Sequence, residues 1–164
     1  MKKLKAFWER LYEPIPLYCL GRLSDIFSTA VGVEVCGIEK ELNARLREAM
    51  RRHGVFKGLA LGELETLPYI LPLVGFYIIE SFWRKKRGIK GRSLVGGVLD
   101  TVGILSLTTA AMNLSVYMHK AHGMNFLLGS IASSILLSPL WVGYLKRWKE
   151  RVESLYRFFE RRRN

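Results

Sequence analysis

The chain has 164 residues, a formal net charge of +12, 49% hydrophobic residues and 24% charged residues. The charged and apolar residues are segregated into blocks, which excludes an ordinary soluble domain and is typical of a membrane protein. The basic residues flank the apolar blocks, where Lys and Arg orient membrane spans and contact anionic lipid headgroups, so the charge does not indicate nucleic-acid binding. We expect the whole chain, 1–164, to form a single membrane domain.

A basic and aromatic segment, 1–14, opens the chain. Its apolar side chains fall on one helical face, which predicts a short amphipathic helix lying in the membrane interface. Trp8, Glu9 and Arg10 stand where a cleavable signal peptide would have its apolar core. We therefore expect the first membrane helix to act as an uncleaved targeting signal.

Four apolar blocks follow, and each is long enough to cross a hydrocarbon core of about 30 Å. They lie at about 15–38, 58–83, 94–118 and 124–145. The first block is the most polar, because Arg22, Asp25 and Glu34 interrupt it. We predict an all-α fold: an integral membrane bundle of four transmembrane helices, with amphipathic helices at the interfaces.

Polar residues inside a membrane are costly, so those of the first block are functional candidates. Asp25, Thr29, Gly32 and Cys36 recur at i, i+4, i+7 and i+11 and share one helical face. This face must turn toward other helices rather than toward lipid. Arg22, three residues before Asp25, is the expected local ion partner. A buried structural hydrogen-bond site and a functional site both remain open as interpretations.

The connection between the first two blocks, 39–57, carries six basic and three acidic residues. Leu42, Leu46, Ala49 and Met50 make an apolar stripe, which predicts an amphipathic helix on the outer surface. Five acids lie in or beside the connection: Glu34, Glu39, Glu41, Glu63 and Glu65. Such clusters bind cations, but we expect the neighbouring lysines and arginines to neutralise this one.

The third block also has a polar face. Its members are Ser106, Thr109, Asn113 and Tyr117. The amide of Asn113 lies well inside the span and must find partners across a helix contact. Asp100 lies closer to the basic loop, and we predict that it is a structural residue in a salt bridge with Lys90 or Arg92.

The fourth block carries small residues at four-residue spacing, which predicts a helix-packing face. These residues are Gly129, Ser130, Ser133, Ser134 and Ser138. The tail that follows, 146–164, has eight basic and three acidic residues and an apolar stripe. It is expected to continue the fourth helix, and two roles remain open: resting on lipid headgroups, or docking another protein.

Orientation follows from the basic segments. The connection 84–92 has six basic residues and no acid, and both ends of the chain are basic as well. Four spans put all three on one face, which the positive-inside rule makes cytoplasmic. We therefore expect a multi-pass protein of the cell membrane with both termini in the cytoplasm. The connection 39–57 then lies outside, against the rule.

The two cysteines do not indicate a disulfide, and the histidines give only a weak metal signal. Cys19 and Cys36 are 17 residues apart, about 25 Å along a helix, which is too far for a disulfide. His119 and His122 lack a neighbouring acidic or cysteine ligand. Because the common hydrolase, metalloprotease and phosphate-binding motifs are also missing, we expect no cofactor and lean against an enzyme.

The stretch LSDIFSTAVGVEVCGIEKELN, residues 23–43, resembles the signature of an uncharacterised family of small four-helix membrane proteins in archaea and bacteria. That signature has an Asp, a Thr four residues on, a Gly, and then a glycine-led E-L-N-P. The corresponding positions are Asp25, Thr29, Gly32, Gly37, Glu41 and Asn43. Ala44 replaces the family's Pro, and residues 39–40 stand as an insertion. The later spans agree only in placement, including a third-helix Asn at Asn113. The resemblance implies four spans and a polar focus at the outer end of the first span, without an activity.

Three functions are compatible with these patterns. The leading hypothesis is a non-enzymatic membrane protein that binds a cation or a proton between its helices. Its ligands would be Asp25, Thr29, Glu41, Asn43 and Asn113. The alternative is an accessory subunit that stabilises a larger membrane complex through the serine face and the basic tail, and the third is an intramembrane enzyme.

Overall fold

The computed structural model describes residues 13–41, 43–89, 91–123 and 125–163. Within these residues the fold is all-α, as predicted, with five α-helices and one short 3-10 helix. They are α2 (Pro14–Cys36), η1 (Ile38–Lys40), α3 (Ala44–His53), α4 (Val55–Lys86), α5 (Leu94–His122) and α6 (Phe126–Arg163). The interfacial helix predicted for 1–14 falls almost entirely on residues 1–12, outside the described part.

Local sequence signals set the helix boundaries. Pro14 occupies the first turn of α2, where its missing N–H costs nothing. Gly37 follows α2 with φ of 88°, a conformation that favours glycine, and so ends the helix. Asn43 caps α3, accepting from the backbone N–H groups of Arg45 and Leu46 at 3.1 and 3.2 Å. These signals place η1 and α3 as a compact connection between α2 and α4.

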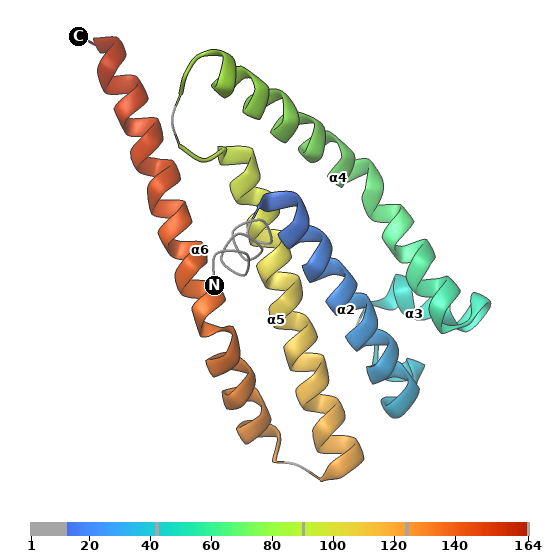
Figure 1. Cartoon of the computed structure of the whole chain (residues 1–164). Coiled ribbons are helices and arrows are strands. Elements are labelled where there is room, and N and C mark those ends of the chain that lie inside the picture. The colour runs from blue at the N-terminus through green and yellow to red at the C-terminus, as the bar shows by residue number, and fades with distance from the viewer. Residues whose placement is uncertain (1–12, 42, 90, 124, 164) are drawn as a thin grey trace, which may run out of the picture.

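The four long helices run alternately up and down the bundle (Figure 1). α5 lies at the centre, with α2 packed along one side and α6 along the other. α4 has far fewer contacts with α2 and α5, while α3 packs on the first turns of α4. The end of α4, the starts of α2 and α5, and the end of α6 therefore share one end of the bundle, and the η1–α3 connection lies near the other.

The crossing of α2 and α5 depends on two glycines. A Cβ added to Gly103 would lie 2.7 Å from the backbone oxygen of Leu17, and one added to Gly21 would clash with the Gly103 backbone. Leu17 and Leu99 are almost fully buried beside this crossing. Small residues let helix backbones approach this closely, which is how membrane helices gain packing energy.

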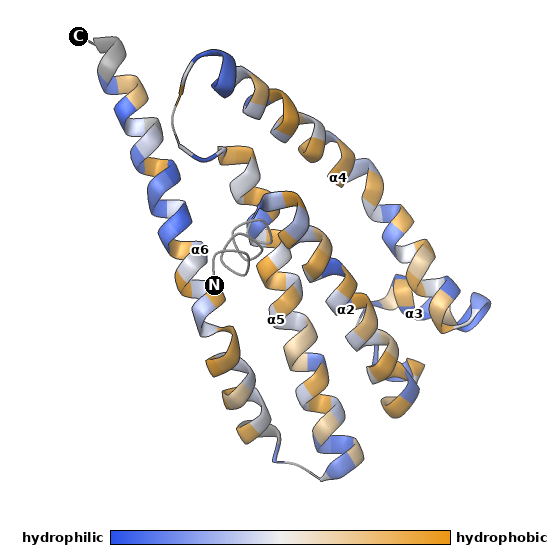
Figure 2. Cartoon of the chain, in the orientation of Figure 1, coloured by the Kyte–Doolittle hydropathy of each residue, from blue (hydrophilic) through white to orange (hydrophobic). Residues whose placement is uncertain are grey.

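Three helices are long and apolar enough to cross a membrane, which indicates a multi-pass membrane protein. They are Val55–Lys86, Leu94–His122 and the part of α6 from Leu128 to Glu160. Large apolar side chains are exposed along α4 and the first half of α6, for example Leu71 and Leu136. Figure 2 colours much of both stretches as hydrophobic. In a bilayer these surfaces face lipid. α2 coincides with the first predicted block but is not among these three candidate spans, because Arg22 and Asp25 lower its mean hydropathy.

Candidate functional site

A cavity of about 570 Å³ lies between α2, α5, the start of α4 and the η1–α3 connection. All five ligands predicted from the sequence line it: Asp25, Thr29, Glu41, Asn43 and Asn113. They come from α2, α5 and the connection, so residues up to 88 positions apart in the chain meet here. The structure therefore brings the predicted residues together in one place.

The polar face of α2 forms one wall of this cavity. Its lining residues run from Arg22 to Cys36, about 21 Å along the helix axis at 1.5 Å per residue. Gly32 leaves open space, because a Cβ added there would meet nothing within 4 Å. The cavity thus extends from the middle of α2 to the connection, where Lys40 and Asn43 are exposed.

Arg22 links two carboxylates at the inner end of the cavity. Its Nη1 lies 3.2 Å from Oδ2 of Asp25, which confirms the predicted local ion pair. It also donates to both oxygens of Glu63 on α4, with Nε 3.3 Å from Oε2. Glu63 was expected in an acidic cluster at the outer surface, and this pairing across helices was missed. Arg22 consequently keeps a carboxylate partner even without Asp25.

Asn113 connects α5 to α2. Its Nδ2 donates to Ser28 Oγ and Thr29 Oγ1, both at 3.2 Å. The prediction that this amide finds partners across a helix contact is confirmed. Ser28 in turn donates to the backbone oxygen of Asp25 at 3.0 Å. These hydrogen bonds fix the positions of Ser28 and Thr29 in the turn of α2 that follows Asp25.

The connection contributes groups that also have structural roles. Glu41 Oε1 accepts from the backbone N–H of Asn43 at 2.8 Å, and Asn43 itself caps α3. The apolar side of α3 packs on α4 rather than lying free on the surface, since Met50 is fully buried beside Leu59. Leu42, part of the predicted stripe, is outside the described residues.

The predicted acidic cluster is neutralised only in part: of its five members, Glu39 pairs with Arg51 and Glu63 with Arg22. Glu48, outside the predicted cluster, pairs with Arg52 at 2.7 Å. The hydrogen bond from Arg51 holds the pKa of Glu39 below its ordinary value, and the hydrogen bond from Arg52 does the same to the pKa of Glu48. Among the described residues, no three His, Cys, Asp or Glu side chains are grouped to hold a metal ion.

Asp100 has other partners than those predicted. It is fully buried and faces α6, where Arg151 Nη2 lies 2.5 Å and Arg147 Nε 3.4 Å from its Oδ2. Arg92 instead pairs with Glu150, and Lys90 is outside the described residues. The predicted bridge to Arg92 was wrong because α6 runs antiparallel to α5 and brings its own arginines to the depth of Asp100.

The tail continues α6 as one helix, as predicted, but its polar side turns inward. Arg147, Arg151 and Ser154 are buried, whereas Val152 and Phe159 of the apolar stripe are exposed. The spacing of the buried residues at i, i+4 and i+7 was visible in the sequence and marks one helical face. Arg147 and Arg151 thus hold the tail against the bundle. The two predicted roles of the tail, resting on lipid headgroups or docking another protein, remain predictions.

The small-residue face of α6 is divided by the structure. Gly129 is buried, and Ser133 Oγ lies 3.0 Å from Ser115 Oγ on α5. Ser130 is half-buried, while Ser134 and Ser138 are exposed and donate to the backbone of their own helix. Of the five predicted packing residues, Ser133 thus contacts α5 and Gly129 is buried, whereas Ser134 and Ser138 do not pack against another of the described helices.

No protein-family model, curated protein or solved structure matches this chain. The family resemblance of residues 23–43 accordingly remains a prediction.

Proposed function

We propose that α2 is a fourth membrane span. It has 23 residues, about 34 Å at 1.5 Å per residue, which suffices for a hydrocarbon core of about 30 Å. Its central charges, Arg22 and Asp25, are paired with each other and face the cavity, while Glu34 lies two residues from the helix end. This arrangement avoids exposing charge to lipid. The alternating directions of the helices put the end of α4 and the tail at one end of the bundle and the η1–α3 connection near the other. The basic residues of the first end support its assignment to the cytoplasm, with the η1–α3 connection outside.

Thiol labelling tests this topology. In a background without Cys19 and Cys36, we expect Lys86→Cys to resist a membrane-impermeant maleimide in right-side-out vesicles. Arg52→Cys and Lys120→Cys should react, because both positions are exposed at the opposite end of the bundle. Permeabilised vesicles provide the control, since all three should then react. Labelling of Lys86→Cys in sealed vesicles would contradict four spans with a cytoplasmic 84–92.

We further propose that the protein binds a monovalent cation or a proton in the cavity, with Asp25 as its charged ligand. The observation that carries this proposal is the convergence of the five predicted ligands on one cavity. The charged lining residues are Asp25, Glu41, Glu63, Arg22 and Lys40, which leaves one net negative charge. A single positive charge balances it, whereas a divalent metal usually requires more carboxylates.

The geometry around Asp25 supports this role. Arg22 contacts only Oδ2, so Oδ1 is left for another partner, and the side chain is 20% exposed. Thr29, on the same wall, adds a hydroxyl oxygen, and Asn113 adds an amide oxygen from α5. Oxygen atoms of this kind are the ligands that hard cations prefer. Asp25 lies at the middle of α2, where a bound cation would offset the cost of a membrane carboxylate.

Replacing Asp25 by Asn separates a binding site from a structural one. Because Arg22 keeps Glu63 as a partner, Asp25→Asn should fold. The wild-type protein in detergent should have a higher melting temperature in its preferred cation than in N-methylglucamine. At 100 times the dissociation constant, the cation should raise the free energy of unfolding by about 2.7 kcal/mol. This gain should weaken as the pH falls, since protons compete for the carboxylate, and Asp25→Asn should lose it. The measurement is a set of melting curves across pH in Li⁺, Na⁺, K⁺ and NH₄⁺.

Glu65→Gln is the matched control, because this exposed glutamate loses the same charge and does not line the cavity. It should respond to cations as wild type does. A wild type indifferent to every cation and to pH, with an unfolded Asp25→Asn, would sink the proposal. That result would favour the alternative of an accessory subunit with a purely structural polar site.

A further inference from the structure

A second cavity, of about 370 Å³, lies at the opposite end of the bundle, where α4 ends and α5 begins. Its described lining includes four cationic side chains and one carboxylate, so the wall carries three net positive charges. The cations are Arg84, Lys85, Arg92 and Arg151, and the carboxylate is Glu13. Ser81 and Ser93 add hydroxyl groups. Such a wall is suited to an anion that accepts several hydrogen bonds.

Two of these arginines are held in place from behind. Arg84 donates to Ser154 Oγ at 3.0 Å and to Glu80 at 3.4 Å. Arg151 donates to the backbone oxygen of Ser93 at 2.7 Å, in addition to its ion pair with Asp100. Within the described residues, Arg84 Nε and Arg151 Nη1 are buried without a hydrogen-bond partner. The guanidinium groups are therefore pre-organised, and each has one donor to which the described residues supply no acceptor.

The nearby carboxylate of Glu80 is hydrogen-bonded to the start of α5. It accepts from Ser93 Oγ and from the backbone N–H groups of Leu94 and Val95, the latter two at 3.1 Å. These bonds satisfy the first turn of α5, so the helix start is not available to a ligand. An anion in this cavity would be held by the arginine and lysine side chains.

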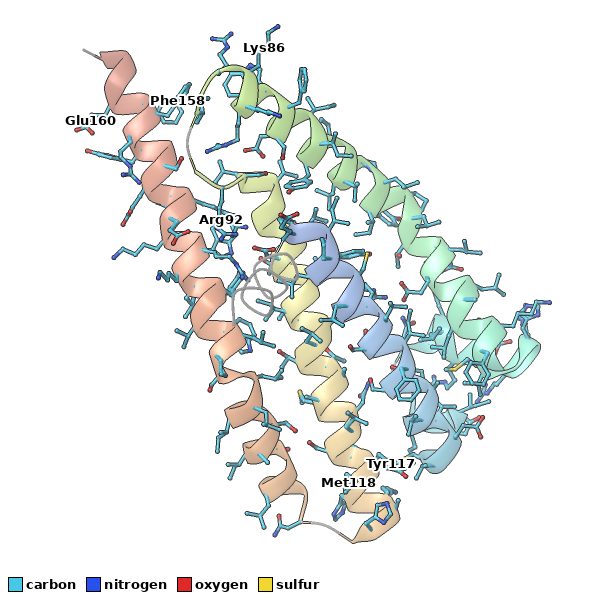
Figure 3. The ribbon with its side chains drawn as sticks, viewed as in Figure 1. Lys86, Arg92, Tyr117, Met118, Phe158 and Glu160 are labelled. Atoms are coloured by element: carbon cyan, nitrogen blue, oxygen red, sulfur yellow. The ribbon has the colours of Figure 1, made fainter. Side chains whose placement is uncertain are left out.

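The surroundings of the cavity favour a lipid over a free ion. Phe82 and Trp83, at the end of α4, are 70% and 40% exposed. Trp83 contacts Phe158 of α6 edge-on at 6.3 Å, and Phe158 and Lys86 lie at this end of the molecule (Figure 3). Aromatic residues are enriched at the level of lipid headgroups, and the exposed apolar side chains of α4 extend from there along the bundle. The acyl chains of a lipid bound here by its phosphate could pack along the exposed apolar side chains of α4.

We propose that this cavity binds the phosphate of an anionic phospholipid. Arg84 and Arg151 supply fixed donors, and Lys85 and Arg92 close the site from the solvent side, where both are exposed. The site lies at the end opposite the cation cavity and does not depend on it. Arginine forks match phosphate oxygens, and each nearby cation strengthens attraction to anionic lipid.

The test compares two double variants of equal charge in a neutral detergent. Lys85→Gln with Arg92→Gln removes two cations from the cavity wall and spares the buried arginines, so the fold is retained. Lys86→Gln with Lys146→Gln removes two exposed cations outside the cavity. Native mass spectrometry measures bound phosphatidylglycerol, with phosphatidylcholine, glycerol 3-phosphate and inorganic phosphate as competitors.

We expect wild type to hold one phosphatidylglycerol tightly, and the cavity variant to bind it about tenfold or more weakly. The control variant should bind nearly as wild type, and the soluble phosphates should compete poorly. Equal loss in both double variants would reduce the effect to diffuse surface charge and overturn the proposal. Displacement of the lipid by glycerol 3-phosphate or inorganic phosphate at matching concentrations would overturn the lipid assignment in favour of a free phosphate.

Discussion

Gly103→Ala should destabilise the protein, whereas Gly75→Ala should stabilise it, although both add one methyl group to the interior of a helix. At Gly103 the new Cβ would lie 2.7 Å from the backbone oxygen of Leu17. Neither backbone can yield without separating α2 from α5, and overpacking of this kind costs about 1–3 kcal/mol. At Gly75 nothing lies within 4 Å, so the change only removes backbone freedom from the unfolded chain and gains about 0.5–1 kcal/mol.

Melting curves in detergent, followed by circular dichroism, measure both variants. Gly143→Ala on α6 provides a second control, because a Cβ there also meets nothing within 4 Å. Equal responses of Gly103→Ala and Gly75→Ala would contradict the close crossing of α2 and α5. Since the cavity that we propose to bind a cation lies between these helices, separating them should also abolish any dependence of the melting temperature on cations.

Asp100→Asn should lower the free energy of unfolding by about 3–5 kcal/mol, which is typical when a buried ion pair loses one partner. Asp100 is fully buried, and both Arg147 and Arg151 are buried against it. The variant leaves two guanidinium groups in a region of low dielectric without their carboxylate. Thermal unfolding measured as above should show a large fall in the melting temperature.

Two further variants separate ion pairing from other effects. Arg92 and Glu150 form an ion pair at the surface, with their side chains 44% and 47% exposed. Glu150→Gln breaks this pair and should lower the free energy of unfolding by no more than about 1 kcal/mol. Adding Arg151→Met to Asp100→Asn removes one of the stranded charges and should recover part of the loss. If Asp100→Asn melts as Glu150→Gln does, the buried pair does not fasten the tail to α5.

The sequence by itself determined the helical segments and the content of each helical face. Blocks of apolar residues predicted α4, α5 and the first half of α6. A carboxylate, a hydroxyl and a glycine at helical spacing predicted that one side of α2 faces other helices, and that side lines the cavity. These are local properties, because the period of 3.6 residues fixes which side chains of one helix lie together. The helix cap formed by Asn43 also depends only on nearby residues, although Asn43 was predicted from the sequence as a cation ligand and not as a cap.

Only the tertiary structure decided which faces meet. Apolar residues surround the membrane helices on every side, so hydrophobic periodicity does not distinguish a lipid-facing side from a packed one. That Ser133 rather than Ser134 or Ser138 packs between helices follows from its contact with Ser115 on α5, 18 residues away in the sequence. The pairing of Asp100 with Arg151 joins positions 51 residues apart. It arises because α6 lies antiparallel to α5 and is long enough to place its basic tail beside the first turns of that helix.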